Sequence, residues 1–199
     1  MILATAIENF GIYIIKAKNG KVLEVGEFNR ENGGNVRLWA EAGGNTQQWQ
    51  FEKVTDDYYQ IVNIFSGKVL DVAMQGAEDG AWVHQWDYIG ADTQLWALEP
   101  AGRGWYKIKN KLSGKCLDLV GLGSMDGTPA QIWHDVDGTT QKWKLVKPED
   151  AAKKPAARKP AAKTAAKKPA AKKPAAKKPA AKRGPAKKAP ATPPADPKA

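Results

Sequence analysis

The sequence repeats itself three times at a spacing of 47 residues, and this repeat constrains the fold more than any other feature. The segment NGKVLEV (19–25) recurs as SGKVLDV (66–72) and SGKCLDL (113–119). The same step relates four further sets: Gly33, Gly80 and Gly127; Trp39, Trp86 and Trp133; Gln47, Gln94 and Gln141; Trp49, Trp96 and Trp143. Three copies therefore follow one another, at about 8–54, 55–101 and 102–147.

Each copy is predicted to contain four short strands. In the second copy the apolar runs YYQIVNI, KVLDVA, AWVHQWDY and QLWALEP are separated by turn signals such as Ser66-Gly67 and Asp79-Gly80. About twelve strands with threefold repetition and no helical periodicity predict an all-β fold, a β-trefoil, over residues 1–148. A three-bladed propeller is a poor alternative, because propellers typically have four to eight blades.

The charge divides the chain into two parts. The net charge is +10, but residues 151–199 hold 16 basic residues and one acid, which leaves −5 on residues 1–150. All aromatic residues lie before residue 150. A segment with high charge and no aromatic residue cannot form a core, so a disordered Lys/Ala/Pro-rich tail is predicted over residues 149–199.

Alternation along the predicted strands separates core positions from surface positions. Leu and Val flank Glu24, Asp71 and Asp118, so these acids are predicted to point outward. In the next strand the outward positions hold Arg37 with Trp39, His84 with Trp86, and Gln131 with Trp133. Trp49, Trp96 and Trp143 fall on an apolar face and are predicted to be core residues. Each copy therefore presents a carboxylate and a Trp side by side, a pair suited to a sugar hydroxyl and a sugar ring face.

Three Q-x-W motifs close the copies, Gln47-Gln48-Trp49, Gln94-Leu95-Trp96 and Gln141-Lys142-Trp143. With the G-K-x-L-D-V and D-G-x-x-V-x-x-W segments, they resemble the ricin B-chain-like lectin family, which includes family 13 carbohydrate-binding modules. The resemblance covers residues 8–147 and implies glycan binding by the aspartate of the L-D-V segment and an aromatic residue fifteen positions later. The implied carbohydrate-binding residues are Asp71, His84, Trp86, Thr93, Gln94, Asp118, Gln131, Trp133, Thr140, Gln141 and, more weakly, Glu24, Trp39 and Gln47.

Two departures from the family pattern affect these sites. The first copy has Glu24 in place of aspartate, with Arg37 beside it to neutralise the charge. The family commonly has Asn before the Q-x-W glutamine, whereas this chain has Thr46, Thr93 and Thr140, which reach less far. Structural roles also stay open: the aspartates as turn caps, the outward Trp as half-buried packing, and the glutamines as ties between strands.

No catalytic, metal or cofactor site is predicted. The chain has one cysteine, Cys116, and two histidines, and it contains no P-loop, dinucleotide fingerprint or G-x-S-x-G motif. The N-terminus lacks a basic signal-peptide region, so a cytoplasmic location is expected, with signal-less export left open. The protein is also expected to be a monomer.

The tail is expected to bind polyanions, nucleic acid or acidic polysaccharide, without sequence specificity. Its predicted polyanion-binding residues are Lys167, Lys168, Lys172, Lys173, Lys177, Lys178, Lys182 and Arg183. The leading hypothesis is therefore a non-catalytic lectin with a polyanion-binding tail. The alternative is a nucleic-acid-binding or scaffold protein whose trefoil is a docking body, and a weaker one is an accessory module of a separate enzyme.

Overall fold

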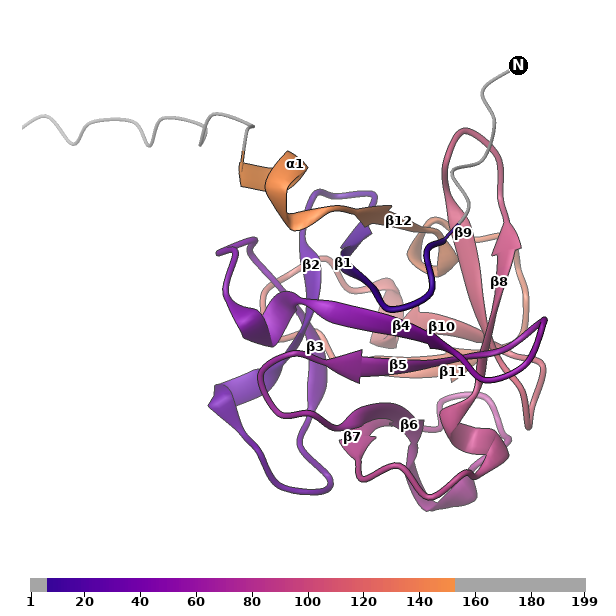
Figure 1. The fold of residues 1–199 in the computed structure, drawn as a ribbon. Coiled ribbons are helices and arrows are strands. Elements are labelled where there is room, and N and C mark those ends of the chain that lie inside the picture. The colour runs from indigo at the N-terminus through magenta and orange to yellow at the C-terminus, as the bar shows by residue number, and fades with distance from the viewer. Residues whose placement is uncertain (1–6, 153–199) are drawn as a thin grey trace, which may run out of the picture. The chain divides into compact units, whose positions relative to one another are not determined.

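The computed structural model describes residues 7–152, in which twelve strands pair into one antiparallel sheet (Figure 1). The strands are β1 (Gly11–Ala17), β2 (Val22–Val25), β3 (Val36–Trp39), β4 (Trp49–Lys53), β5 (Tyr59–Asn63), β6 (Val69–Val72), β7 (Val83–Trp86), β8 (Trp96–Pro100), β9 (Tyr106–Asn110), β10 (Cys116–Leu119), β11 (Ala130–Trp133) and β12 (Trp143–Val146). Short 3-10 helices follow the second strand and precede the fourth strand of each copy: η1 (Gly26–Phe28), η2 (Asn45–Gln47), η3 (Ala73–Gln75), η4 (Asp92–Gln94), η5 (Val120–Leu122) and η6 (Thr139–Gln141).

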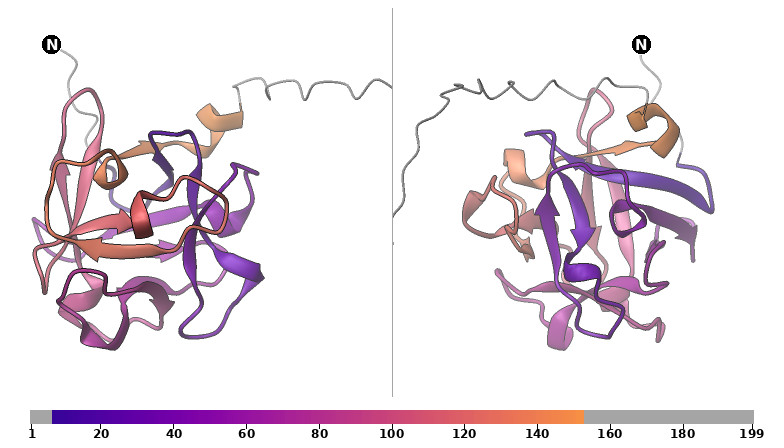
Figure 2. Two further views of the ribbon diagram at one scale, coloured as in Figure 1. Left: turned by 180° about the vertical axis from the view of Figure 1, so that it is seen from behind. Right: turned by 90° about the vertical axis from the view of Figure 1, so that its left-hand side faces the viewer.

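Six of the strands form a closed antiparallel ring. β1 pairs with β4, β4 with β5, β5 with β8, β8 with β9, β9 with β12, and β12 with β1. Figure 2 shows the last of these pairings, in which the first and last strands of the body lie side by side. Because the ring closes, none of its strands is left as a free edge.

The other six strands form one hairpin per copy, β2–β3, β6–β7 and β10–β11. Each hairpin is attached to the ring through its first strand. The second strands meet one another through single bridges, Asn35↔His84, Arg37↔Pro129 and Trp82↔Gln131. A six-stranded ring with three hairpins in threefold repetition confirms the predicted β-trefoil.

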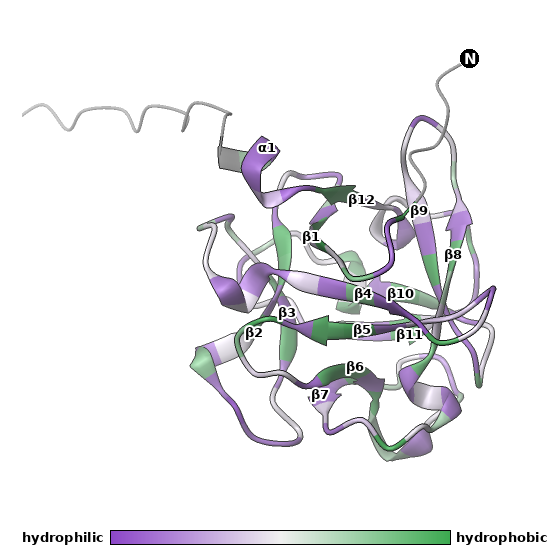
Figure 3. Cartoon of the chain, viewed as in Figure 1, coloured by the Kyte–Doolittle hydropathy of each residue, from purple (hydrophilic) through white to green (hydrophobic). Residues whose placement is uncertain are grey.

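The core lies inside the ring and beneath the hairpins. Hydrophobic residues gather in the strands, and the connecting loops are largely hydrophilic (Figure 3). Trp49, Trp96 and Trp143 are fully buried, which confirms them as core residues. Their Nε1 atoms donate to carbonyl oxygens in the second strand of the same copy, at Leu23 (3.1 Å), Leu70 (2.9 Å) and Leu117 (3.0 Å). Each Q-x-W strand is thereby fixed to its own hairpin.

The repeat is irregular at one turn. Each core Trp pairs with a tyrosine of a neighbouring ring strand, and these are Tyr13, Tyr59 and Tyr106. The first two tyrosines are 46 residues apart, whereas the second and third are 47 apart. Ala17, Asn63 and Asn110 then occupy equivalent places, because each backbone N–H donates to the lysine carbonyl of the following turn. The first turn is therefore one residue shorter than the other two.

The last described element is the helix α1 (Pro148–Ala152). Its first helical residue is a proline, and Glu149 and Asp150 lie in its first turn, where acids are favoured by the helix dipole. The prediction that the tail is disordered from residue 149 is therefore wrong for these first residues. The predicted polyanion-binding tail residues lie outside the described part of the chain. Among residues 7–152, no helix is long and apolar enough to cross a membrane.

Candidate functional site

The structure contains three equivalent candidate sites, one on each hairpin. Site 1 is formed by Glu24, Arg37 and Trp39, site 2 by Asp71, His84 and Trp86, and site 3 by Asp118, Gln131 and Trp133. In each, the carboxylate residue lies directly opposite the residue two before the Trp, as in Glu24↔Arg37, Asp71↔His84 and Asp118↔Gln131. Directly opposed residues of an antiparallel pair share one face, so the predicted groups are brought together in all three copies.

The carboxylates are not exposed, which corrects the prediction that they face solvent. Glu24, Asp71 and Asp118 are only 7%, 7% and 3% exposed. They point away from the core, but the glutamine of the Q-x-W motif covers them. Its Nε2 donates to a carboxylate oxygen over 3.0 Å from Gln47, 3.3 Å from Gln94 and 3.1 Å from Gln141.

The same glutamines hold the loop beside each site. Their Oε1 atoms accept from the backbone N–H groups of Ala42 (2.7 Å), Ile89 (2.8 Å) and Val136 (3.0 Å). Gln47, Gln94 and Gln141 are at most 1% exposed. These glutamines therefore position the carboxylate and the loop. This is the structural role that the sequence analysis gave as an alternative to sugar binding.

Site 1 is closed by its own cation. Arg37 Nε donates to Glu24 Oε1 over 3.1 Å, while the other carboxylate oxygen accepts from Gln47. The Arg37 guanidinium also lies 4.3 Å from the centre of the Trp39 ring, a cation–π contact. The arginine thus contacts both the carboxylate and the indole that the sequence predicts as binding groups.

Site 2 is covered by His84. The imidazole stacks on Trp86, with ring centres 5.3 Å apart and planes 23° apart. His84 Nε2 also lies 3.5 Å from Asp71 Oδ2. The other oxygen, Asp71 Oδ1, is buried and accepts no hydrogen bond from the described residues. His84 therefore contacts both groups of site 2, the indole and the carboxylate.

Among residues 7–152, no lysine or arginine contacts both the Asp118 carboxylate and the Trp133 ring of site 3, although the His134 ring lies 5.8 Å from the Trp133 ring. Gln131 is neutral, and its Nε2 donates over 3.4 Å to the backbone carbonyl of Leu119. Asp118 accepts from Gln141 and from the N–H of Leu119 (2.7 Å), both uncharged donors. Each carboxylate oxygen can accept two hydrogen bonds, so Asp118 has acceptor capacity left for a hydroxyl group.

One wall of each site comes from a different copy, a feature that sequence reasoning missed. A side-chain carbon at Gly33 would lie 3.8 Å from the Trp86 ring, one at Gly80 3.7 Å from Trp133, and one at Gly127 3.8 Å from Trp39. These glycines also have φ between +82° and +87°, which favours glycine. The 47-residue spacing of the glycines was visible in the sequence, but not which Trp each one meets.

The loop against site 3 is fixed by charge. Asp79 accepts from Lys115 Nζ (2.7 Å) and from the backbone N–H of His134 (2.7 Å), and its other oxygen lies 2.6 Å from His134 Nδ1. These contacts, the Lys115 bond foremost, lower the pKa of Asp79 to about 2. The carboxylate is therefore charged at neutral pH and joins the second copy to the third.

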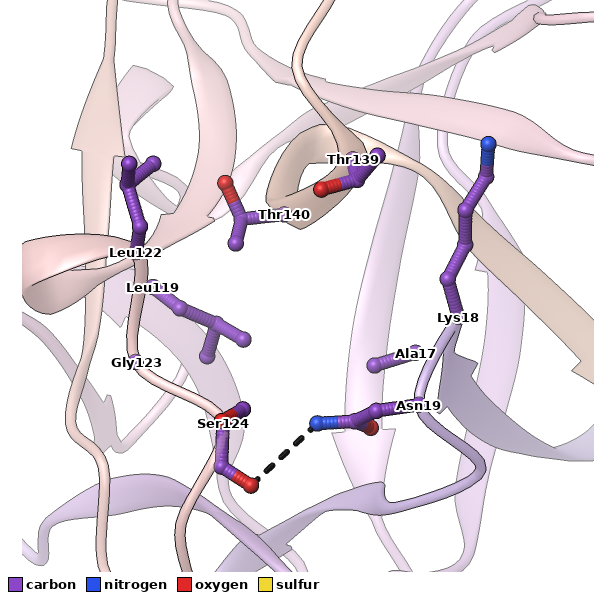
Figure 4. A pocket seen from close by; sticks show the side chains of 9 residues that line it. All are labelled: Ala17, Lys18, Asn19, Leu119, Leu122, Gly123, Ser124, Thr139 and Thr140. Carbon is purple, nitrogen blue, oxygen red and sulfur yellow. Dashed lines mark hydrogen bonds between the residues drawn. The ribbon is translucent and has the colours of Figure 1, made fainter.

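A pocket of about 110 Å³ lies at the junction of the third copy with the first (Figure 4). Its lining residues are Ala17, Lys18, Asn19, Leu119, Leu122, Gly123, Ser124, Thr139 and Thr140. At the other two junctions, Asn63 and Asn110 donate to the carbonyls of Thr46 (3.0 Å) and Thr93 (2.8 Å). Ala17 has no such side chain, so the space stays open. The predicted site residue Thr140 lines this pocket, whereas Thr93 is buried.

Comparison with known protein families also identifies a β-trefoil lectin-like domain. The family described as "Ricin-type beta-trefoil lectin domain-like" matches residues 6–86, 45–133 and 92–154. A search of curated protein sequences gave no match.

Among solved structures, a designed threefold-symmetric protein, ThreeFoil, is 38% identical with a TM-score of 0.68, covering 69% of this chain and 99% of that chain. An exo-β-1,3-galactanase from Clostridium thermocellum is 37% identical with a TM-score of 0.68, covering 71% of this chain. A Polyporus squamosus lectin bound to Neu5Acα2-6Galβ1-4GlcNAc is 26% identical with a TM-score of 0.61, also covering 71% of this chain. The present chain spans only 31% of the galactanase chain and 50% of that lectin chain.

The closed ring, the three hairpins, the repeated carboxylate–Trp sites and the family match all agree. The chain belongs to the ricin-type β-trefoil lectin-like family, and at the level of that family it is a carbohydrate-binding lectin.

Proposed function

We propose that this protein is a non-catalytic lectin that binds glycans chiefly at site 3. The observation that carries the proposal is the neutral Gln131, which stands where Arg37 and His84 contact both the carboxylate and the Trp at sites 1 and 2. The His134 ring also lies 5.8 Å from the Trp133 ring, but its Nδ1 lies 2.6 Å from Asp79 Oδ2, so it contacts Asp79. The indole face packs on the C–H face of a sugar ring, and the carboxylate accepts hydroxyl hydrogen bonds. Affinity for a single sugar at one shallow site is on the order of millimolar.

Galactose-containing glycans are the ligand class we propose. The exo-β-1,3-galactanase, 37% identical over the matched region, is named for its action on β-1,3-galactan. The lectin that is 26% identical is bound to a glycan with a central galactose. These relatives guide the choice of sugars for the first binding experiments.

The contacts of Asp118 support binding without catalysis. Gln141 and the backbone N–H of Leu119 hold the Asp118 carboxylate in place, contacts that suit a fixed hydrogen-bond acceptor. The thiol of Cys116 is fully buried, and this burial raises its pKa to about 11, which leaves it unreactive at neutral pH.

A titration of the full chain with β-1,3-galactobiose, after a glycan array, tests the proposal. Trp133→Ala or Asp118→Asn is expected to weaken binding at least about tenfold, because hydrogen bonds to charged groups contribute about 1.5–3 kcal/mol. Trp39→Ala is the matched control, the same residue type at the equivalent position of closed site 1, and should leave binding unchanged. Two results would contradict site 3 as the sugar site: no glycan binding by the wild type on the array, or equal losses of affinity in Trp133→Ala and Trp39→Ala.

We further propose that residues 153–199 bind polyanions such as heparin or DNA, on the strength of the +15 charge of residues 151–199. If about six of these charges meet phosphates, the logarithm of the binding constant should fall with the logarithm of salt concentration with a slope near −5. Truncation after residue 152 should abolish this binding and leave galactoside binding intact. Salt-insensitive DNA binding by the truncated chain would instead favour the alternative, a nucleic-acid-binding or scaffold protein with the trefoil as its docking body.

A further inference from the structure

We propose that Trp82 forms a second sugar-binding platform beside site 3, so that this site takes an oligosaccharide rather than a single sugar ring. The inference rests on the proposed function, because the sugar held by Asp118 and Trp133 is its starting point. Trp82 belongs to the second copy and lies at the repeat position that Asn35 and Pro129 occupy in the other two copies.

The strand pairings place Trp82 next to site 3. Trp82 lies directly opposite Gln131 in an antiparallel bridge, and Asp118 lies opposite Gln131 on its other side. Opposed residues of antiparallel strands share a face, so Asp118, Gln131 and Trp82 form one row across three neighbouring strands. With neighbouring strands about 4.8 Å apart, this row spans roughly 10 Å, about the length of a disaccharide.

Two aromatic rings therefore flank Gln131. Trp133 is two residues further along β11, and Gly80 of the opposing loop lies against its ring. Trp82 is the next outward side chain of that loop, which makes it the diagonal neighbour of Trp133. Diagonal neighbours in a sheet have their Cβ atoms about 7–8 Å apart, within reach of one ligand for side chains of this size.

Trp82 combines a hydrogen-bonded backbone with an exposed side chain. Its carbonyl accepts from the Ala73 N–H over 2.8 Å, so the residue is held to its own hairpin. The residue is nevertheless 57% exposed, whereas Trp49, Trp96 and Trp143 are fully buried. An exposed indole offers an apolar face for a sugar ring and an N–H donor for a hydroxyl group.

The arrangement points to a chain of at least two sugar rings, one on Trp133 and Asp118 and the next over Trp82. The corresponding neighbours are Asn35 at site 2 and Pro129 at site 1. Neither has an aromatic ring, so the extended platform is specific to site 3, the same site that has the neutral Gln131 opposite its carboxylate.

Titration of the full chain with galactose, β-1,3-galactobiose and β-1,3-galactotriose tests the inference. Trp82→Ala is expected to lower the affinity for the two oligosaccharides about two- to tenfold and to leave galactose binding unchanged. Trp82→Phe keeps an aromatic ring and should lose less oligosaccharide affinity than Trp82→Ala. Asn35→Ala, at the equivalent position of the first copy, is the matched control and should change none of the three affinities.

Unchanged oligosaccharide affinity in Trp82→Ala would overturn the inference, as would equal losses for galactose and the oligosaccharides. A dimer in the wild type that Trp82→Ala dissociates, seen by sedimentation with oligosaccharide affinity unaltered, would also overturn it by assigning the ring to self-association. Absence of binding of all three sugars by the wild type would overturn the proposed function itself. The inference alone fails where the wild type binds and Trp82→Ala binds equally well.

Discussion

Replacing Trp96 with alanine is expected to destabilise the trefoil by about 3–5 kcal/mol, the cost of emptying a fully buried Trp site. Trp96 is 0% exposed, and it pairs with Tyr59 of the neighbouring strand β5. Its Nε1 donates over 2.9 Å to the Leu70 carbonyl, so alanine leaves both a cavity and a buried carbonyl without its donor. Natural domains are stable by only about 5–15 kcal/mol, so this loss removes a large part of the total.

Urea unfolding followed by circular dichroism measures the effect. Trp96→Phe should lie between the wild type and Trp96→Ala, since it keeps an aromatic ring but loses the N–H donor. Trp82→Ala removes the same side chain from an exposed position, so its change in unfolding free energy should stay within about 0.5 kcal/mol. Similar losses for Trp82→Ala and Trp96→Ala would show that burial of the Q-x-W Trp is not what stabilises the fold.

The fold was predictable because the repeat and the strand alternation are both local patterns. The 47-residue step identifies three equal units, and alternation assigns Trp49, Trp96 and Trp143 to the core, where the structure has them. The 47-residue repeat did not predict the shorter first turn, although Tyr13 and Tyr59 are only 46 residues apart in the sequence. Helix α1 was missed because the composition of the whole tail obscured the helix-start signals of Pro148 and Glu149.

The sequence predicted which residues lie together at each candidate site, but not the contacts that these residues make. Spacing paired each carboxylate with its Trp, but it does not show that the Q-x-W glutamine folds over the carboxylate, since that contact joins residues 23 apart. Nor does spacing show that His84 stacks on Trp86, which depends on rotamers. The placement of Trp82 beside Gln131 was not predictable because the two residues belong to different copies, although Trp82 stands out against Asn35 and Pro129 at the equivalent positions.

The double substitution Glu24→Asp/Arg37→Gln is expected to open site 1. It gives the first hairpin the same two residues as site 3 and removes the guanidinium that lies 4.3 Å from the Trp39 ring centre. The shorter aspartate can still accept from the Q-x-W glutamine, as Asp118 does over 3.1 Å. On a surface coated with β-1,3-galactan, two open sites should raise the apparent affinity about a hundredfold through avidity, if both sites engage.

The sharper version of this experiment uses a chain in which site 3 is inactive. In a Trp133→Ala background, Glu24→Asp/Arg37→Gln should restore binding of galactose in solution, where avidity plays no part. Arg37→Gln alone should restore less, because Glu24 is one methylene longer than aspartate and would place a bound sugar ring differently. Persistent loss of binding in the rescued chain, with an unchanged unfolding curve, would mean that Arg37 and Glu24 are not what separates site 1 from site 3.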